Sequence, residues 1–177
     1  MQRAFVMTVI GPDRPGLVES VAAIVAEHGG NWLESRMSRL GGQFAGILRV
    51  EVPADDESSL LSALKQLEAR DLTIVVQPDK AAPPYPASAQ LSSLDIVGQD
   101  RPGIVRQISR TLANHRVNVE ELETACASAP MSGEPLFKAH AVVNIPPSCN
   151  TAALREDLEK IAADLIVEIS LVDLRQP

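Results

Sequence analysis

The sequence predicts an α+β protein built from two tandem βαββαβ units, each an antiparallel four-stranded sheet with two helices on one face. Three observations lead to this prediction. The phrase Gly-x-Asp-Arg-Pro-Gly occurs twice, at 11–16 and 98–103, and each copy follows a short apolar run and opens a stretch of helical periodicity. A proline-rich stretch separates the two halves. We therefore expect a first domain at 1–77, a linker at 78–90 and a second domain at 91–177.

The repeat extends beyond the phrase itself. Gly11 and Gly98 are 87 residues apart (98 minus 11), and the same offset relates other matching residues. These pairs are Asp13 and Asp100, Arg14 and Arg101, Pro15 and Pro102, Gly16 and Gly103, His28 and His115, Asn31 and Asn118, and Glu34 and Glu121. So many polar matches indicate an internal duplication.

The composition is that of a packed globular chain. The 177 residues are 45% hydrophobic and only 3% aromatic, with a mean hydropathy of +0.04, so the cores must be aliphatic. A net charge of −7, shared by both halves, argues against a basic nucleic-acid-binding module. Two cysteines, Cys126 and Cys149, form no CxxC motif.

The sequence carries no signal for a membrane or for secretion. No apolar run approaches the roughly 18 residues of a membrane span. The N-terminus lacks a basic region followed by an apolar stretch and a cleavage site. We expect a cytoplasmic protein that makes no membrane contact.

The first unit contains six predicted elements. The turn Gly41-Gly42 makes a hairpin, and acidic residues 55–57 precede the second helix. The elements are a strand at 5–10, a helix at about 15–27, strands at 32–40 and 43–52, a helix through Leu60–Leu67 and a strand at 72–76.

The second unit repeats this order with a longer hairpin turn, 127–135. Long loops in compact domains are often functional, so we expect Met131, Ser132 and Gly133 to touch a ligand or a partner. The predicted elements are a strand at 91–97, a helix at about 102–115, strands at 117–126 and 136–145, a helix at about 151–163 and a strand at 165–174.

A βαββαβ unit forms the ferredoxin-like architecture, in which one sheet face remains open. Apolar residues on that face must be covered by the sister domain or by another subunit. We therefore expect a homo-oligomer.

The turn residues suit an anion-binding helix start. Gly11 and Gly98 permit positive φ or a close approach of another group. Pro15 and Pro102 suit the first helical turn. Asp13 and Asp100 are placed to accept hydrogen bonds from free N–H groups there. The remaining donors could bind a small anionic group.

The phrase Gly-x-Asp-Arg-Pro-Gly-[Leu/Ile]-Val between the first strand and helix, with Asn at the start of the second strand, resembles the ACT domain, a small-molecule-binding regulatory module. Two such domains, with Pro130-Met-Ser-Gly-Glu-Pro-Leu-Phe137 in the second hairpin, resemble the glycine cleavage system transcriptional repressor family.

The resemblance implies a non-enzymatic allosteric regulator that senses an amino acid such as glycine. It also implies action through a DNA-binding transcription factor, without direct nucleic-acid binding. No segment has the basic recognition helix of a helix-turn-helix, which agrees with this implication. Gln99 stands where the first copy has Pro12, so the two sites need not bind equally well.

A free amino acid would place its carboxylate on the turn N–H groups and its ammonium near Asn or Asp oxygens. Alternatively, these residues only shape the turn and cap the helix. The candidate ligand-binding residues are Gly11, Asp13, Arg14, Gly16 and Asn31, and Gly98, Asp100, Arg101, Gly103 and Asn118. The two arginines could pair with an anion or with a carboxylate across a domain interface, or have no specific partner.

The other polar residues point to no cofactor, metal or catalytic site. His28 and His115 lie at predicted helix ends and are interpreted as structural. His140 lies in a strand with no acidic or Cys partner at ligand spacing. Residues 55–57 with Glu51 lack the regular oxygen spacing of a cation loop.

Parts of the sequence also suit three other functions. A phosphate-loop hydrolase using Arg14 and Asn31 lacks both the acylphosphatase phrase and a nucleophile or acid–base pair. An RNA-recognition module needs strand aromatics and a basic surface. The open alternative is a ligand-free ACT scaffold or a regulatory subunit of an amino-acid-metabolism enzyme.

Overall fold

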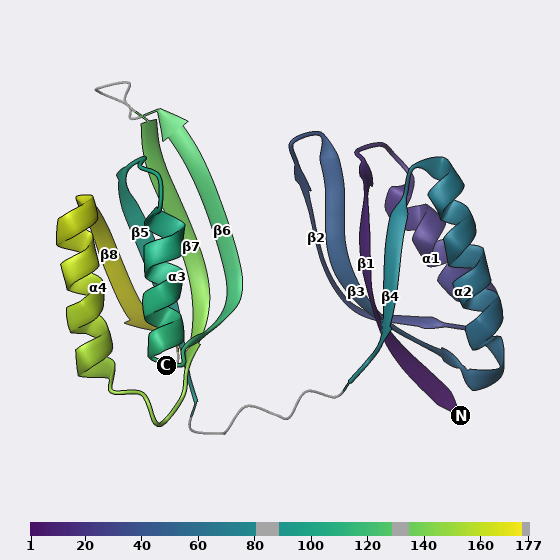
Figure 1. Ribbon diagram of the computed structural model, residues 1–177. Helices are drawn as coiled ribbons and strands as arrows, with labels where there is room; N and C mark the ends of the chain where they lie inside the picture. Colours follow the sequence, from purple (N-terminus) through teal and green to yellow (C-terminus); the bar gives the residue numbers. More distant parts are fainter. Residues whose placement is uncertain (81–88, 129–134, 175–177) are drawn as a thin grey trace. The chain divides into compact units, whose positions relative to one another are not determined.

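A computed structural model of the chain describes residues 1–80, 89–128 and 135–174. The chain divides into two compact units, Met1–Ala82 and Pro83–Pro177. Each unit contains its own four-stranded sheet and two helices (Figure 1). Most of the predicted linker, and the hairpin positions Met131, Ser132 and Gly133, lie outside the described residues.

The first unit has the predicted βαββαβ order. Its sheet is antiparallel with strand order β2-β3-β1-β4. Two short 3₁₀ helices, Ala54–Asp56 and Leu67–Arg70, flank α2. The main elements are β1 (Gln2–Pro12), α1 (Leu17–Glu27), β2 (Asn31–Leu40), β3 (Gln43–Pro53), α2 (Glu57–Gln66) and β4 (Thr73–Pro78).

The second unit repeats the order and the topology. Its strand order is β6-β7-β5-β8, again antiparallel, which confirms the predicted ferredoxin-like fold in both units. Its elements are β5 (Gln90–Gln99), α3 (Ile104–Asn114), β6 (Asn118–Ser128), β7 (Pro135–Ile145), α4 (Thr151–Leu165) and β8 (Val167–Asp173).

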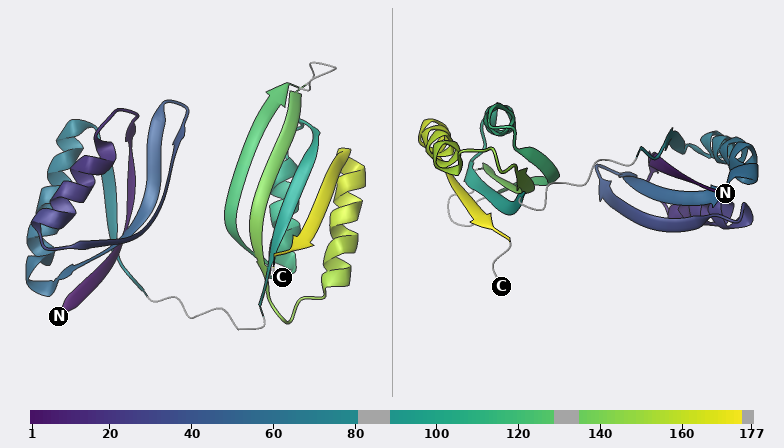
Figure 2. Two further views of the ribbon diagram at one scale, coloured as in Figure 1. Left: turned by 180° about the vertical axis from the view of Figure 1, so that it is seen from behind. Right: turned by 90° about the horizontal axis from the view of Figure 1, so that it is seen from below.

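Each unit has an aliphatic core between its sheet and its helices. Figure 2 shows that both helices of a unit cover the same face of its sheet. Alternate residues of the central strands point into these cores, such as Met7 and Leu48 in the first unit and Leu94 and Val143 in the second. Among the described residues of each unit, no helix of that unit covers the opposite face of its sheet.

The hairpin between β2 and β3 confirms the predicted Gly41-Gly42 turn. Both glycines have positive φ, 58° and 78°, the conformation that a two-residue hairpin favours and that glycine adopts without steric cost. Upstream of this turn, β2 contains a bulge between Trp32 and Glu34, and β6 has one at the equivalent place, between Val119 and Glu121.

The helices after the repeated phrase begin two residues later than predicted. α1 starts at Leu17 and α3 at Ile104, because Gly16 and Gly103 occupy the N-cap position in the left-handed conformation, with φ of 88° and 98°. Pro15 therefore precedes the helix instead of forming its first turn. The described helices include none that is both long and apolar enough to cross a membrane.

Candidate functional site

The two copies of the phrase fold into the same strand-to-helix turn. A Cβ on Gly11 would lie 2.7 Å from the carbonyl oxygen of Asp71, and one on Gly98 would lie 2.5 Å from Cγ1 of Val167. Neither has positive φ, so close approach is the reason for glycine here. Gly16 and Gly103 instead face open space and supply the positive φ that ends the turn.

The prediction that Asp13 and Asp100 cap the helices is wrong. Neither α1 nor α3 has a side-chain cap, because the positive φ of the N-cap glycine turns the chain between the aspartate and the first helical residue. Instead, the backbone N–H of each aspartate donates a hydrogen bond to a carbonyl oxygen at the hairpin end. Asp13 N donates to the oxygen of Gly42 at 2.9 Å, and Asp100 N donates to that of Pro135 at 3.0 Å.

Uncapped helix starts leave N–H groups of the first turn without a side-chain acceptor. In both units these donors lie at the end of the first strand, beside the hairpin end to which the turn is bound. The turn therefore keeps N–H donors without a side-chain acceptor, as anion binding requires. These donors remain because the aspartate does not cap the helix, which differs from the prediction.

The two turns differ in the group that faces the aspartate. In the first unit Arg39 Nε lies 2.6 Å from Asp13 Oδ2. The residue 87 positions later, Cys126, has the same ladder position, because it pairs with Phe137, which in turn pairs with Gly98. Partial desolvation, followed by the charge of Asp100 and a hydrogen bond to it, raises the pKa of the Cys126 thiol. The thiol therefore stays protonated and is poorly suited to nucleophilic chemistry.

Sequence reasoning missed these two residues, although the 87-residue offset already related them. Local pattern gave no reason to place Arg39 or Cys126 at the turn. The antiparallel ladders bring them there from the far end of the second strand of each unit.

Asn31 and Asn118 do not join their turns. Asn31 stands opposite Glu51, which pairs with Ala4, whereas the turn begins at Gly11. Seven residues of strand separate Ala4 from Gly11, roughly 23 Å at the ordinary rise per residue. A single amino acid therefore cannot contact Asn31 and the turn of the same unit.

Neighbouring carboxylates bind these two asparagines. Asn31 Nδ2 donates to Glu51 Oε1 at 3.5 Å, and Asn118 Nδ2 donates to Glu120 Oε1 at 2.9 Å. In the second turn, Arg101 donates to Gln99 Oε1 at 3.0 Å, so part of its guanidinium is engaged within the turn. Arg14 holds the equivalent position in the first turn.

Two of the histidines bind within their own units. His28 Nδ1 lies 2.8 Å from the carbonyl oxygen of Ile24 at the end of α1. His115 Nε2 lies 2.9 Å from Asp157 Oδ2 and links α3 to α4. Hydrogen bonds from His115 and then Lys160 lower the pKa of Asp157. These contacts support a structural role.

His140 has an acidic partner in the structure, although none lies at ligand spacing from it in the sequence. Asp95 faces it across the β5–β7 ladder, with 2.7 Å between Asp95 Oδ1 and His140 Nδ1. Ser93 also donates to Asp95, at 2.7 Å. The partner is 45 residues away in sequence, so no local spacing could reveal it. Within residues 1–80, 89–128 and 135–174, no group of three or more His, Cys, Asp or Glu side chains is arranged to hold a metal.

Comparison with known proteins agrees with the two-unit fold. A model of the ACT domain matches residues 3–77 and 94–172. The glycine cleavage system transcriptional repressor of Escherichia coli K12 is 25% identical over 173 residues, covering 96% of this chain and 90% of that protein. The Shigella flexneri protein of the same name gives the same values.

Two solved structures share the whole two-unit fold. A protein of unknown function from Galdieria sulphuraria has 29% identity and a TM-score of 0.86, over 98% of this chain and 99% of that one. A crystal structure provisionally named as a glycine cleavage system transcriptional repressor has a TM-score of 0.72 at 18% identity, over 99% of both chains.

These similarities support a regulatory protein made of ACT domains. The two matched segments follow the two structural units and together span most of the sequence. The chain therefore belongs to the ACT domain family.

Proposed function

We propose that this protein is a non-enzymatic regulator that senses a small amino acid, with glycine as the first candidate, and acts on a DNA-binding transcription factor through protein contact. The observation that carries the proposal is the strand-to-helix turn built twice, at 11–16 and 98–103. Each copy ends in an N-cap glycine with positive φ and leaves the helix start without a side-chain cap.

The chemistry of the turn suits one end of an amino acid. Its carboxylate would accept from the uncapped N–H groups of the first helical turn, where the helix dipole also favours negative charge. Its ammonium would lie near the aspartate of the same turn, Asp13 or Asp100. Asn31 and Asn118 lie too far along their strands to contribute to that ligand from the same unit.

The target of regulation is proposed from the relatives' names and from charge. The similar Escherichia coli protein is named a transcriptional repressor. A net charge of −7 opposes direct binding to DNA, which is itself a dense polyanion. We therefore place a DNA-binding protein between this chain and the promoter. Linkage requires that this partner alter the affinity for the amino acid as much as the amino acid alters the affinity for the partner.

Thermal unfolding against the twenty amino acids at millimolar concentration tests the proposal. A ligand that binds only the native state stabilises it by about 2.7 kcal/mol when its concentration is 100 times Kd. We expect a selective rise in the unfolding midpoint for one or a few small amino acids. If none of the twenty raises the midpoint, sensing at these turns is refuted.

Matched variants at the two turns identify the one that binds. Asp13→Asn and Asp100→Asn each remove one carboxylate charge while keeping side-chain size. Loss of the ligand-dependent shift in only one of them assigns binding to that turn. Gly16→Val is a poorer choice, because a β-branched residue at φ 88° strains the backbone whether or not a ligand binds.

A ligand-free interaction scaffold is the second candidate function. It is favoured by the apolar residues exposed on the first unit's open sheet face, Ile10, Ile47 and Val75, each about half exposed. The scaffold predicts partner binding that is unchanged by every amino acid tested. The sensor predicts an affinity that changes with one of them.

A further inference from the structure

The helices that follow the two turns, α1 and α3, carry opposite charges at equivalent positions. Each helix presents a row of three residues spaced four apart, which places them along one line of the helix surface. The acidic row on α1 has two negative charges, and the basic row on α3 has two positive charges. The rows are Glu19, Ala23 and Glu27 on α1, and Arg106, Arg110 and Asn114 on α3, each 87 positions after its counterpart.

The acidic row lines a groove of about 400 Å³ between α1 and α2. Leu67 is buried and Ile24 is half-buried, so these two side chains form an apolar floor, whereas Glu19 and Glu27 are exposed at the rim. Short side chains, such as that of Ala63 on α2, leave the space between the helices open. None of the residues that line the groove is cationic.

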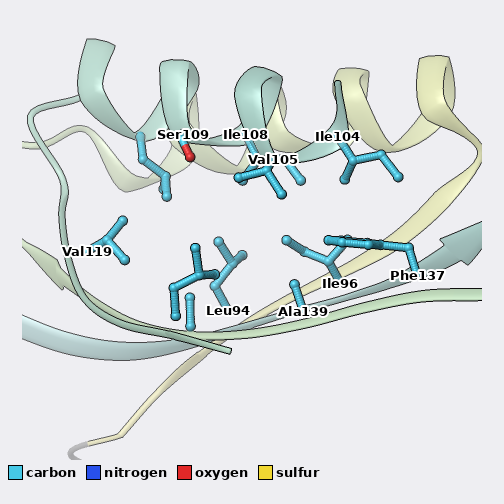
Figure 3. A pocket seen from close by; sticks show the side chains of 12 residues that line it. Leu94, Ile96, Ile104, Val105, Ile108, Ser109, Val119, Phe137 and Ala139 are labelled. Atoms are coloured by element: carbon cyan, nitrogen blue, oxygen red, sulfur yellow. The ribbon is translucent and has the colours of Figure 1, made fainter. Parts of the chain in front are cut away.

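The basic row lies on the outer surface of α3. Ile104 and Ile108 lie on the side of this helix that faces the strands (Figure 3). Arg106 and Arg110 each follow one of these isoleucines by two residues, which corresponds to about 200° around the helix axis. Both arginines are exposed. They therefore point away from the core of their own unit.

Neither row is neutralised by the residues that the structure describes. No carboxylate among them lies within ion-pair distance of Arg106 or Arg110, and no cationic group lies within that distance of Glu19 or Glu27. Apart from Arg116, every other arginine whose side chain is described has a contact of its own. Both rows can therefore accept a partner of opposite charge.

The groove suits the chemistry of an arginine side chain. Arginine combines an apolar stem with a charged head, and its planar guanidinium matches a carboxylate. A stem that lies on Ile24 and Leu67 brings its head to the rim of the groove. The two glutamates are eight residues apart, about 12 Å along α1, and the two arginines are four residues apart, about 6 Å along α3. Both arginines therefore fit within the span of the acidic row.

We propose that the basic row of one copy of the chain docks into the groove between α1 and α2 of a second copy and so forms a homodimer. With α3 antiparallel to α1, Arg106 pairs with Glu27 and the stem of Arg110 crosses Ala23, between the two glutamates. About a two-fold axis the contact forms twice, because each copy carries both rows. This assembly goes beyond the proposed function and does not depend on amino-acid binding at the turns.

Sedimentation of the full chain over a range of concentrations tests the inference without any substitution. We expect a reversible dimer whose dissociation constant rises several-fold between about 0.1 M and about 1 M salt, because the Debye length falls from about 10 Å to about 3 Å. A mass of one chain at every concentration overturns the proposal. A dimer that salt does not weaken overturns it as well.

Charge reversal tests the two faces separately. One variant is Arg106→Glu, Arg110→Glu, and the other is Glu19→Arg, Glu27→Arg. Each alone should raise the dissociation constant at least about tenfold, because like charges then meet across the contact. An equimolar mixture of the two variants should dimerise nearly as well as the parent, because in a mixed dimer every row again faces its opposite. A mixture that associates no better than either variant refutes the contact.

Two further variants control for net charge and for folding. Arg116→Glu changes the charge as much as Arg110→Glu does, but Arg116 lies beyond α3 and outside the row. Only Arg110→Glu should weaken the dimer, and equal effects would refute the site. If a charge-reversed chain does not fold, Arg106→Gln, Arg110→Gln removes both charges without adding repulsion. This milder variant should also weaken the dimer, and an unchanged dissociation constant would overturn the proposal.

Discussion

Asp95 and His140 form a cross-strand pair on the open sheet face of the second unit, with 2.7 Å between Oδ1 and Nδ1. The hydrogen bond to Asp95 raises the pKa of His140 above its ordinary 6.5. Hydrogen bonds from His140 and then Ser93 lower the pKa of Asp95 below its ordinary 3.8. Both groups are therefore held in their charged forms.

The pair predicts a pH-dependent stability. The raised pKa of His140 contributes stability that is complete below pH 6.5 and is lost as pH rises through the folded-state pKa. The lowered pKa of Asp95 contributes stability above pH 3.8, lost as pH falls through its folded-state value. His140→Gln should therefore lower the unfolding midpoint more at pH 5.5 than at pH 8.5. Scanning calorimetry at both pH values checks this, with His28→Gln as the control, and equal losses would contradict it.

Substitution of an N-cap glycine should destabilise the fold through backbone strain, without a steric clash. An added Cβ at Gly103 meets nothing within 4 Å, but φ is 98° there. Gly103→Ala should lower the free energy of unfolding by about 1–2 kcal/mol, the usual cost of a left-handed conformation for an L-residue. Chemical denaturation measures the loss. Gly103→Asn should cost less, because asparagine visits this region more readily, and an alanine variant as stable as the parent would refute the explanation.

At Gly98 we expect a similar loss of stability on substitution, caused by a steric clash and not by backbone strain. Its φ is unexceptional, but an added Cβ would lie 2.5 Å from Val167 Cγ1 and 2.8 Å from the Ile166 carbonyl oxygen. Gly98→Ala should therefore cost about 1–3 kcal/mol, as overpacking does. Trimming the neighbour tests the cause. In a Val167→Ala background the further loss caused by Gly98→Ala should shrink, and an unchanged loss would argue for another origin.

Arg39 predicts a small change in stability. Its ion pair with Asp13 lies at the surface, with side chains 70% and 33% exposed, so Arg39→Ala should change the free energy of unfolding by about 1 kcal/mol or less. Denaturant titration measures this change. Raising the salt concentration should reduce the difference between variant and parent, because exposed pairs are screened. A loss of several kcal/mol would mean that Arg39 has a structural role beyond this pair.

The order of elements was predictable because its signals are local. Apolar runs, the Gly41-Gly42 turn and the repeated phrase each lie within a few residues of the structure they specify. The helix starts were placed two residues early for a local reason as well. Pro15 suits a first helical turn, but Gly16 follows it and takes the left-handed N-cap conformation, which the sequence permits without requiring.

The site was less predictable because strand register determines it. Arg39 reaches the first turn, and Cys126 the second, only through pairing of distant strands, and the same pairing places Asn31 at the far end of the first sheet. The acidic partner of His140 was missed for the same reason. The 87-residue offset was an available signal that the sequence analysis applied only to identical residues; extended to unlike residues, it relates Arg39 to Cys126.

The bulge in β2 has a consequence for reading such strands from sequence. Trp32 and Met37 are five residues apart and would point to opposite faces of a regular strand, yet both pack against the core. The extra residue between Trp32 and Glu34 shifts the alternation by half a period. In an edge strand of this kind, the inward-facing positions before the bulge and those after it follow two different alternations. Deleting Leu33 would restore a single alternation and turn the Trp32 side chain out toward solvent.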